Sequence, residues 1–200
     1  MLAGIAAGLK GPQHLKKKLE ELENSMIAGA AKISESDERV LFTFIGMSLT
    51  SWARMEEVMV VLVRLLLRTD RARAGLIMYS IINFNVWLTL IDDLFDHDPE
   101  FKSFKPRWTK IAERIRRIKD TRDRLAHDTS HQIPAGMSSV PDRYLIPSKY
   151  DFRQKSQRYK PLTKTEIFAF MESVMAITTD LADFVEGMID TYEASLKESS

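Results

Sequence analysis

Cysteine is missing from this sequence of 200 residues. Its absence excludes a disulfide framework, a thiolate metal site and a cysteine nucleophile. A chain without cysteine suits a reducing compartment, and we therefore expect a cytoplasmic protein. Chemistry near neutral pH is left to the four histidines and to the acidic and basic side chains.

Long hydrophobic runs are missing as well. The opening stretch MLAGIAAGLK has no basic segment before its apolar residues and is too short to span a bilayer. The longest apolar stretch, VMVVLVRLLLR, is interrupted by Arg64 and is typical of a buried helix. We therefore expect no export signal and no membrane partner. The sequence also has no nucleotide-triphosphate loop, and we expect no cofactor.

Helical periodicity covers most of the sequence. A chain of this length with 44% hydrophobic residues fits one ordinary domain. We predict an all-α fold, a four-helix bundle over residues 37–198 with an extra N-terminal amphipathic helix in an appendage at 1–36. An irregular insertion, a loop or a hairpin, is predicted at about 128–162. Within the appendage the periodic residues predict a helix over 13–31, and Ser36 is a candidate N-cap for the helix that follows.

The four bundle helices are predicted from apolar spacing and from local start signals. The first runs from Val40 to Leu67, and the second runs from about Ala74 to Phe95 and is apolar on most sides. Pro106 suits the first turn of the third helix, because its missing N–H has no helical partner there. Thr163 and Glu166 form a capping box that opens the last helix.

Charge is distributed unevenly, although the formal net charge is only +1. Residues 105–124 contain nine Lys or Arg and three Asp or Glu, whereas residues 166–198 contain eight acidic residues and a single lysine. The third helix is therefore basic and the last helix acidic. The basic helix suits a polyanion, but it could equally pair with the acidic helix.

An aspartate-rich stretch, DDLFD, ends the second predicted helix. Asp92 and Asp96 are four residues apart and share a helix face, as in sites that hold Mg²⁺ against a diphosphate. Such sites need a second acidic cluster, and Asp180 with Asp183 is only a pair. We favour a solvated or salt-bridged corner, with metal ligands as the alternative.

The stretch IKDTRDRLAHDT closes the third helix and places Arg122 on its apolar stripe. Charged side chains are rarely buried without partners. Arg122 could pair with a carboxylate such as Glu56, Glu57 or Asp92, or it could face a ligand. Asp123 and His127 are four residues apart, so the carboxylate could orient the imidazole. His127 could instead be a helix-terminal cation without a catalytic role.

RDRLAH, residues 122–127, has the form RxxxxH with a polar residue after the arginine. In the position where it closes the third long helix of a bundle, it resembles the signature of the HEPN (higher eukaryotes and prokaryotes nucleotide-binding) superfamily. The resemblance covers the helix arrangement of roughly residues 38–195. A glycine commonly follows the histidine in that family, whereas this sequence has Asp128.

The resemblance implies a metal-independent endoribonuclease, acting as a toxin or defence factor. It implies a homodimer in which two motifs share one cleft, with Arg122, Asp123 and His127 as the catalytic residues. His127 would move protons, because histidine is the side chain type best able to exchange protons near neutral pH, and Arg122 would bind phosphate oxygens. Asp123 would orient His127.

Basic and aromatic residues around the motif are candidates for binding RNA. They are Arg114, Arg117, Lys119 and Arg124 on the basic helix and Tyr144, Arg153 and Arg158 in the insertion. Interleaved aromatic and basic residues can stack bases and hold phosphates. The alternative is that the aromatic residues only anchor a long loop.

Expected partners are RNA, a second copy of the chain, and an antitoxin or regulatory protein. The competing hypothesis from another class is a HEPN-type RNA- or nucleotide-binding or regulatory module that keeps the fold and does not cut.

Overall fold

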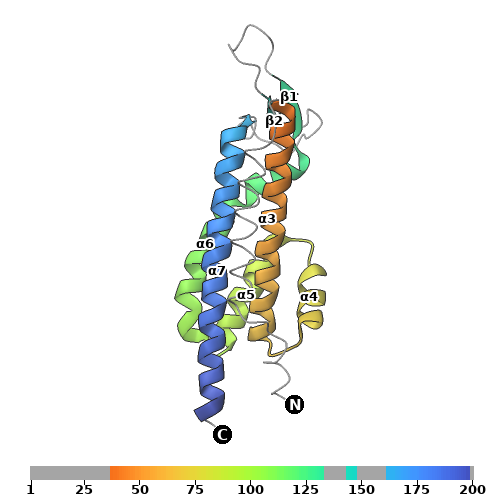
Figure 1. The fold of residues 1–200 in the computed structure, drawn as a ribbon. Coiled ribbons are helices and arrows are strands. Elements are labelled where there is room, and N and C mark those ends of the chain that lie inside the picture. The colour runs from red at the N-terminus through yellow and green to blue at the C-terminus, as the bar shows by residue number, and fades with distance from the viewer. Residues whose placement is uncertain (1–36, 133–142, 148–160, 199–200) are drawn as a thin grey trace. The chain divides into compact units, whose positions relative to one another are not determined.

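The computed structural model describes residues 37–132, 143–147 and 161–198 (Figure 1). These residues are mostly helical, which confirms the all-α prediction at the level of fold class. The α-helices, labelled as in Figure 1, are α3 (Asp37–Leu66), α4 (Arg71–Tyr79), α5 (Phe84–His97), α6 (Lys105–His127) and α7 (Lys164–Glu198). A short 3-10 helix, η1 (Lys102–Phe104), precedes α6.

Three short strands lie between α6 and α7 in the sequence, namely β1 (Thr129–Gln132), β2 (Arg143–Ile146) and β3 (Leu162–Thr163). The predicted helix at 13–31 and the predicted N-cap at Ser36 lie outside the described residues. Across the described ranges, none of the helices combines the length and the apolar composition that crossing a membrane requires.

The chain forms two compact units. Of the described residues, the first unit contains 54–116 and 176–198, and the second contains 37–53, 117–132, 143–147 and 161–175. Helices α3, α6 and α7 each contribute one segment to each unit. The RDRLAH motif therefore belongs to the second unit, and the DDLFD stretch belongs to the first.

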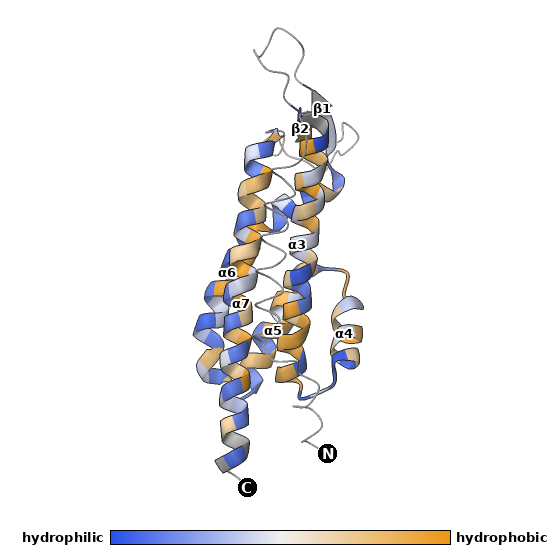
Figure 2. Cartoon of the chain, viewed as in Figure 1, coloured by the Kyte–Doolittle hydropathy of each residue, from blue (hydrophilic) through white to orange (hydrophobic). Residues whose placement is uncertain are grey.

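Aromatic side chains build the core of the first unit. On α5 the buried residues Trp87, Leu88, Ile91 and Phe95 follow helical spacing and share one face. The Phe95 ring lies 6.2 Å from that of Trp108 on α6 and 6.0 Å from that of Phe184 on α7. All three rings are fully buried, and Figure 2 shows hydrophobic residues on α5 and on the last turns of α3. Burial of these rings ties α5, α6 and α7 together within this unit.

The prediction of one continuous second helix is wrong, because Ser80–Asn83 separate α4 from α5. Asn83 is the N-cap of α5, and its side chain accepts a hydrogen bond from the backbone N–H of Asn85 at 2.9 Å. The indole N–H of Trp87 donates to the carbonyl of Ile81 at 2.9 Å and fixes the connection. Hydrophobic periodicity could not reveal this break, since Ile81 and Ile82 continue the apolar pattern.

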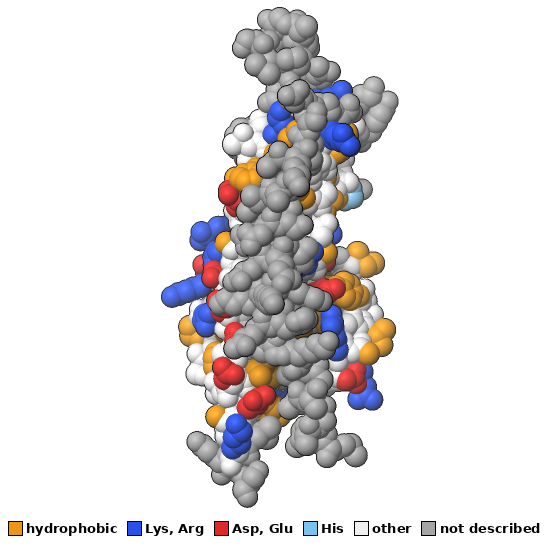
Figure 3. All heavy atoms as spheres, viewed as in Figure 1, with side chains coloured by type: hydrophobic (Ala, Val, Ile, Leu, Met, Phe, Trp, Pro, Cys, Tyr) orange, Lys and Arg blue, Asp and Glu red, His pale blue; other side chains and the backbone are white. Residues whose placement is uncertain are grey.

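Helix α4 and the connection after it expose large hydrophobic side chains. Leu76 is 70% exposed, Tyr79 58% and Ile82 fully exposed. Hydrophobic side chains are visible on the surface at α4 in Figure 3. Apolar side chains gathered in this way are typical of a surface that contacts another molecule.

The second unit packs the start of α3 against the start of α7. The ring centroids of Trp52 and Phe170 lie 6.2 Å apart with their planes nearly parallel, and those of Phe44 and Phe168 lie 5.5 Å apart. The three strands form an antiparallel sheet with β2 in the centre. Thr129 pairs with Ile146 in this sheet. The insertion thus contains a hairpin, as the sequence prediction allowed.

The capping box at the start of α7 is confirmed. The backbone N–H of Glu166 donates to Oγ1 of Thr163 at 3.3 Å, and the backbone N–H of Thr163 donates to Oε2 of Glu166 at 2.9 Å. These reciprocal bonds satisfy donors that the first turn of a helix leaves unpaired. Because Thr163 also belongs to β3, the box fixes the start of α7 directly after the sheet.

Candidate functional site

The end of α6 is fixed by Asp128, the residue that follows the motif. Its backbone N–H donates to the carbonyl of Arg124 at 2.8 Å, and its carboxylate accepts from Nε of Arg124 at 2.8 Å. The Asp128 side chain is only 2% exposed. Strand β1 begins at the next residue, so His127 is the last helical residue.

Arg122 is not sealed within the apolar stripe, since its side chain is 38% exposed. Its Nη1 donates to Oδ1 of Asp123 at 3.2 Å. Its Nε is buried and has no hydrogen-bond partner among the described residues. Two carboxylates that the sequence offered as partners for Arg122 bond other arginines. Glu57 accepts from Arg71, and Asp92 accepts from Arg116. The guanidinium therefore has donor capacity that Asp123 does not use.

Asp123 contacts cations rather than the imidazole. Its Oδ2 accepts from Nζ of Lys119 at 3.4 Å, and its Oδ1 accepts from Arg122. His127 is exposed, and no residue of the described chain hydrogen-bonds its ring. The structure therefore does not bring Asp123 and His127 together as predicted. Positions four residues before and four residues after Asp123 are both neighbours on the helix surface, and in the structure the carboxylate bonds the earlier one, Lys119.

The predicted RNA-binding residues are divided between the two units. Arg117 is exposed on the part of α6 in the second unit, where Lys119 also bonds Asp120 at 3.2 Å. Arg124 is committed to Asp128 and is 19% exposed, which leaves it poorly placed to hold RNA. Tyr144 lies on β2, in register with His131 and Thr163.

Arg114 lies in the first unit and forms an ion pair with Asp180 of α7. This contact matches the alternative in which the basic helix pairs with the acidic last helix. The two remaining candidates, Arg153 and Arg158, lie outside the described residues.

The DDLFD carboxylates form a salt-bridged corner, as favoured from the sequence. Asp92 accepts hydrogen bonds from the indole N–H of Trp108 at 2.7 Å and from Arg116 at 2.8 Å. Asp96 pairs with Lys105, and the hydrogen bond from this lysine lowers the pKa of Asp96 below its ordinary value. Over the described ranges no three His, Asp or Glu side chains are grouped so that they could hold a metal ion. The metal alternative therefore has no geometric support there.

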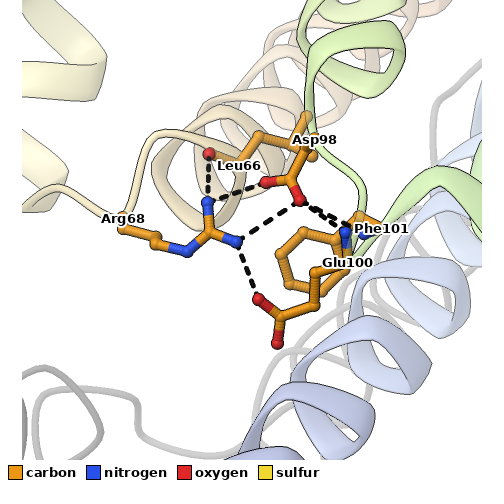
Figure 4. A network of polar contacts seen from close by, with 5 residues as sticks. All are labelled: Leu66, Arg68, Asp98, Glu100 and Phe101. Carbon is orange, nitrogen blue, oxygen red and sulfur yellow. Dashed lines mark hydrogen bonds and ion pairs between the residues drawn. The ribbon is translucent and has the colours of Figure 1, made fainter.

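A second polar cluster, centred on Arg68 in the first unit, was not predicted (Figure 4). Arg68 donates to Oδ2 of Asp98 at 2.7 Å and to Oε2 of Glu100 at 2.8 Å. Its guanidinium carbon lies 5.6 Å from the ring centroid of Phe101 and 5.8 Å from that of Tyr192. Burial alone would raise the pKa of Asp98, but the hydrogen bonds from Arg68 and from the backbone of Phe101 lower it below its ordinary value.

Arg68 also ends α3 in a left-handed conformation, with φ of 48°. The backbone N–H of Thr69 donates to the carbonyl of Arg64, and that of Arg68 donates to the carbonyl of Leu65, both at 3.1 Å. This Schellman motif usually places glycine at the left-handed position. No sequence signal marks Arg68, because the side-chain contacts that favour it come from residues about 30 positions away. Since its charges are satisfied within the cluster, Arg68 acts as an anchor and not as a ligand site.

Comparisons with protein-family models, with curated proteins and with solved structures find no match. The residues at the end of α6 are therefore the basis of the functional proposal.

Proposed function

We propose that this chain is a metal-independent endoribonuclease of the HEPN type, with Arg122 and His127 in its active site. The observation that carries the proposal is the exposure and the incomplete hydrogen bonding of the Arg122 side chain. Its side chain is 38% exposed. Within the described chain its buried Nε has no hydrogen-bond partner, and the guanidinium bonds the adjacent Asp123 alone. A purely structural arginine is expected to have its buried donors paired.

The reaction suits these two side chains. A base takes the proton from a 2′-hydroxyl, and the oxygen attacks the adjacent phosphorus. The bond to the 5′-oxygen breaks as that oxygen receives a proton from an acid, which leaves a 2′,3′-cyclic phosphate and a 5′-hydroxyl. Histidine is the residue type that exchanges protons near neutral pH, which suits His127 to both proton transfers. Arg122 would offset the charge that develops on the phosphate oxygens.

A dimer completes the site in this proposal. His127 follows Arg122 by five residues, which on a helix corresponds to about 7.5 Å along the axis and about 140° around it. The motif of one protomer contains one histidine, whereas the reaction moves one proton to a base and another from an acid. A twofold axis near the end of α6 would place two arginines and two histidines around one phosphate.

A non-catalytic RNA- or nucleotide-binding module is the second candidate. The observation that favours it is the position of Asp123, whose carboxylate bonds Lys119 and Arg122 and leaves the imidazole without an orienting partner in the described chain. An unoriented histidine is a weaker proton carrier. Such a module would bind RNA through Arg122 without cutting it.

RNA cleavage in excess EDTA tests the proposal, with Arg122→Ala and His127→Ala compared with the unmodified chain. Matched controls are Arg71→Ala, in an exposed ion pair with Glu57, and His97→Ala, which is also the last residue of an α-helix. We expect both motif variants to lose at least about 100-fold in rate, the scale on which acid–base and electrostatic groups contribute, while both controls retain activity.

The outcomes separate the candidates. RNA binding without cleavage would favour the non-catalytic module, and loss of activity in EDTA would contradict the metal-free mechanism. Growth arrest on expression that both motif substitutions relieve would support the expected role as a toxin or defence factor.

A further inference from the structure

Asp123 lies between two cations on α6. Lys119 reaches one carboxylate oxygen at 3.4 Å, and Arg122 reaches the other at 3.2 Å. The side chains of Arg122 and Asp123 are 38% and 48% exposed, so this contact is open to exchange with solvent ions. The Asp123 carboxylate thus bridges Lys119 and Arg122 through its two oxygens.

The contact with Asp123 leaves Arg122 incompletely bonded. The buried Nε has no acceptor within the described ranges. An unpaired buried donor costs free energy, so this arrangement is easily exchanged for one with more acceptors. A phosphodiester also carries one negative charge, and its two non-bridging oxygens match the planar fork of a guanidinium.

We propose that Asp123 is a built-in competitor for phosphate at this site. Its carboxylate neutralises Lys119 and Arg122 while the site is empty, and an RNA phosphodiester displaces it and takes both cations. The inference rests on the proposed function for the identity of the site and deepens it by making the site self-inhibited. It concerns binding alone, so it can be tested whether or not the protein cuts RNA.

Asp120 provides a matched control for Asp123. It lies on the same helix, is 69% exposed, and contacts Lys119 at 3.2 Å, but no hydrogen bond or ion pair joins it to Arg122 in the described chain. Asp120→Asn and Asp123→Asn remove the same charge from neighbouring positions. Only Asp123→Asn removes the competing acceptor from Arg122.

The test measures the Kd of a single-stranded 2′-O-methyl oligonucleotide, which lacks the attacking hydroxyl, by fluorescence anisotropy at fixed ionic strength. We expect Asp123→Asn to bind roughly 1.5- to 5-fold more tightly than Asp120→Asn, the range that breaking a weak exposed ion pair allows. Adding Arg122→Ala to Asp123→Asn should abolish this gain. Asp123→Ser serves as a second variant if the asparagine protein does not fold.

Equal affinities for Asp120→Asn and Asp123→Asn would overturn the proposal, because the gain would then be a general charge effect. Weaker binding by Asp123→Asn would also overturn it, since Asp123 would then assist binding. If no form of the protein binds the oligonucleotide, the inference fails, while cleavage of ordinary RNA would still support the proposed function. A gain in binding without any cleavage would support the inference and count against the ribonuclease.

Discussion

At the scale of single residues, two arginines show how differently the same side chain is used. Arg68 bonds two carboxylates and lies over two aromatic rings. Arg122 has one weak contact with its neighbour and a buried Nε without an acceptor in the described chain. The partners of Arg68 fit a structural role, whereas the unused donor of Arg122 is available to the phosphate in the proposed function.

The Arg68 cluster gives a prediction for stability. Asp98→Asn removes the charge from a nearly buried carboxylate that accepts bonds from Arg68 and from the backbone. We expect the free energy of unfolding to fall by about 2 kcal/mol, as for the loss of a hydrogen bond to a charged group. Urea denaturation measures this change. Glu57→Gln, which breaks an exposed pair with Arg71, should change the free energy of unfolding by less than about 1 kcal/mol.

The pH dependence of the unfolding free energy of Asp98→Asn tests whether the charge of Asp98 is the source of the stabilisation. The folded-state pKa of Asp98 is lowered from 3.8, so its ionised form stabilises the fold above that pH. This contribution is lost as the pH falls from 3.8 through the lower folded-state value. The difference in unfolding free energy between the unmodified chain and Asp98→Asn should therefore shrink on acidification. A difference that stays constant down to pH 3 would contradict the ionic explanation.

At the scale of elements, the sequence predicts what short-range contacts decide. The capping box at Thr163 and Glu166 was found because its bonds span three residues. The break between α4 and α5 was missed, because its apolar residues follow the helical pattern and the contact of Trp87 with Ile81 belongs to the folded chain. The partner of Asp123 was missed as well, since helical spacing offers Lys119 and His127 equally.

The capping box gives a prediction for the helix that it opens. Thr163→Val keeps the shape of the side chain but removes the hydroxyl that accepts the backbone N–H of Glu166. We expect a loss of about 1 kcal/mol in the free energy of unfolding. Ser173→Ala removes a hydroxyl from the interior of the same helix, where it bonds the carbonyl of Ala169, and should have a smaller effect. Equal losses of unfolding free energy in the two variants would show that the capping bond of Thr163 does not stabilise α7.

At the scale of the whole molecule, the net charge is only +1, although α6 is basic and α7 is acidic. The sequence predicts both helices but not which charges pair. Arg114 is paired with Asp180 in the first unit, and Arg122 is paired with Asp123 in the second unit. The division into two units was also not predicted, since helical periodicity runs through α3, α6 and α7 without interruption.

The composite site predicts an oligomeric state. We expect sedimentation at several protein concentrations to detect a dimer, because one chain supplies a single His127. Mixing unmodified chains with an excess of His127→Ala chains should lower the activity of the unmodified chains, since the mixed dimer retains only one of the two histidines that the mechanism needs. A monomer at every concentration would remove the basis for the two-histidine mechanism.

The central claim is that Arg122 and His127 cleave RNA through its own 2′-hydroxyl without a metal ion. The most direct measurement is the mass of the product ends formed in EDTA, on an RNA and on the same RNA with one 2′-deoxynucleotide at the cleavage position. We predict 2′,3′-cyclic phosphate and 5′-hydroxyl ends from the RNA and no cut at the deoxynucleotide. Ends carrying a 5′-phosphate, or cleavage at the deoxynucleotide, would contradict it.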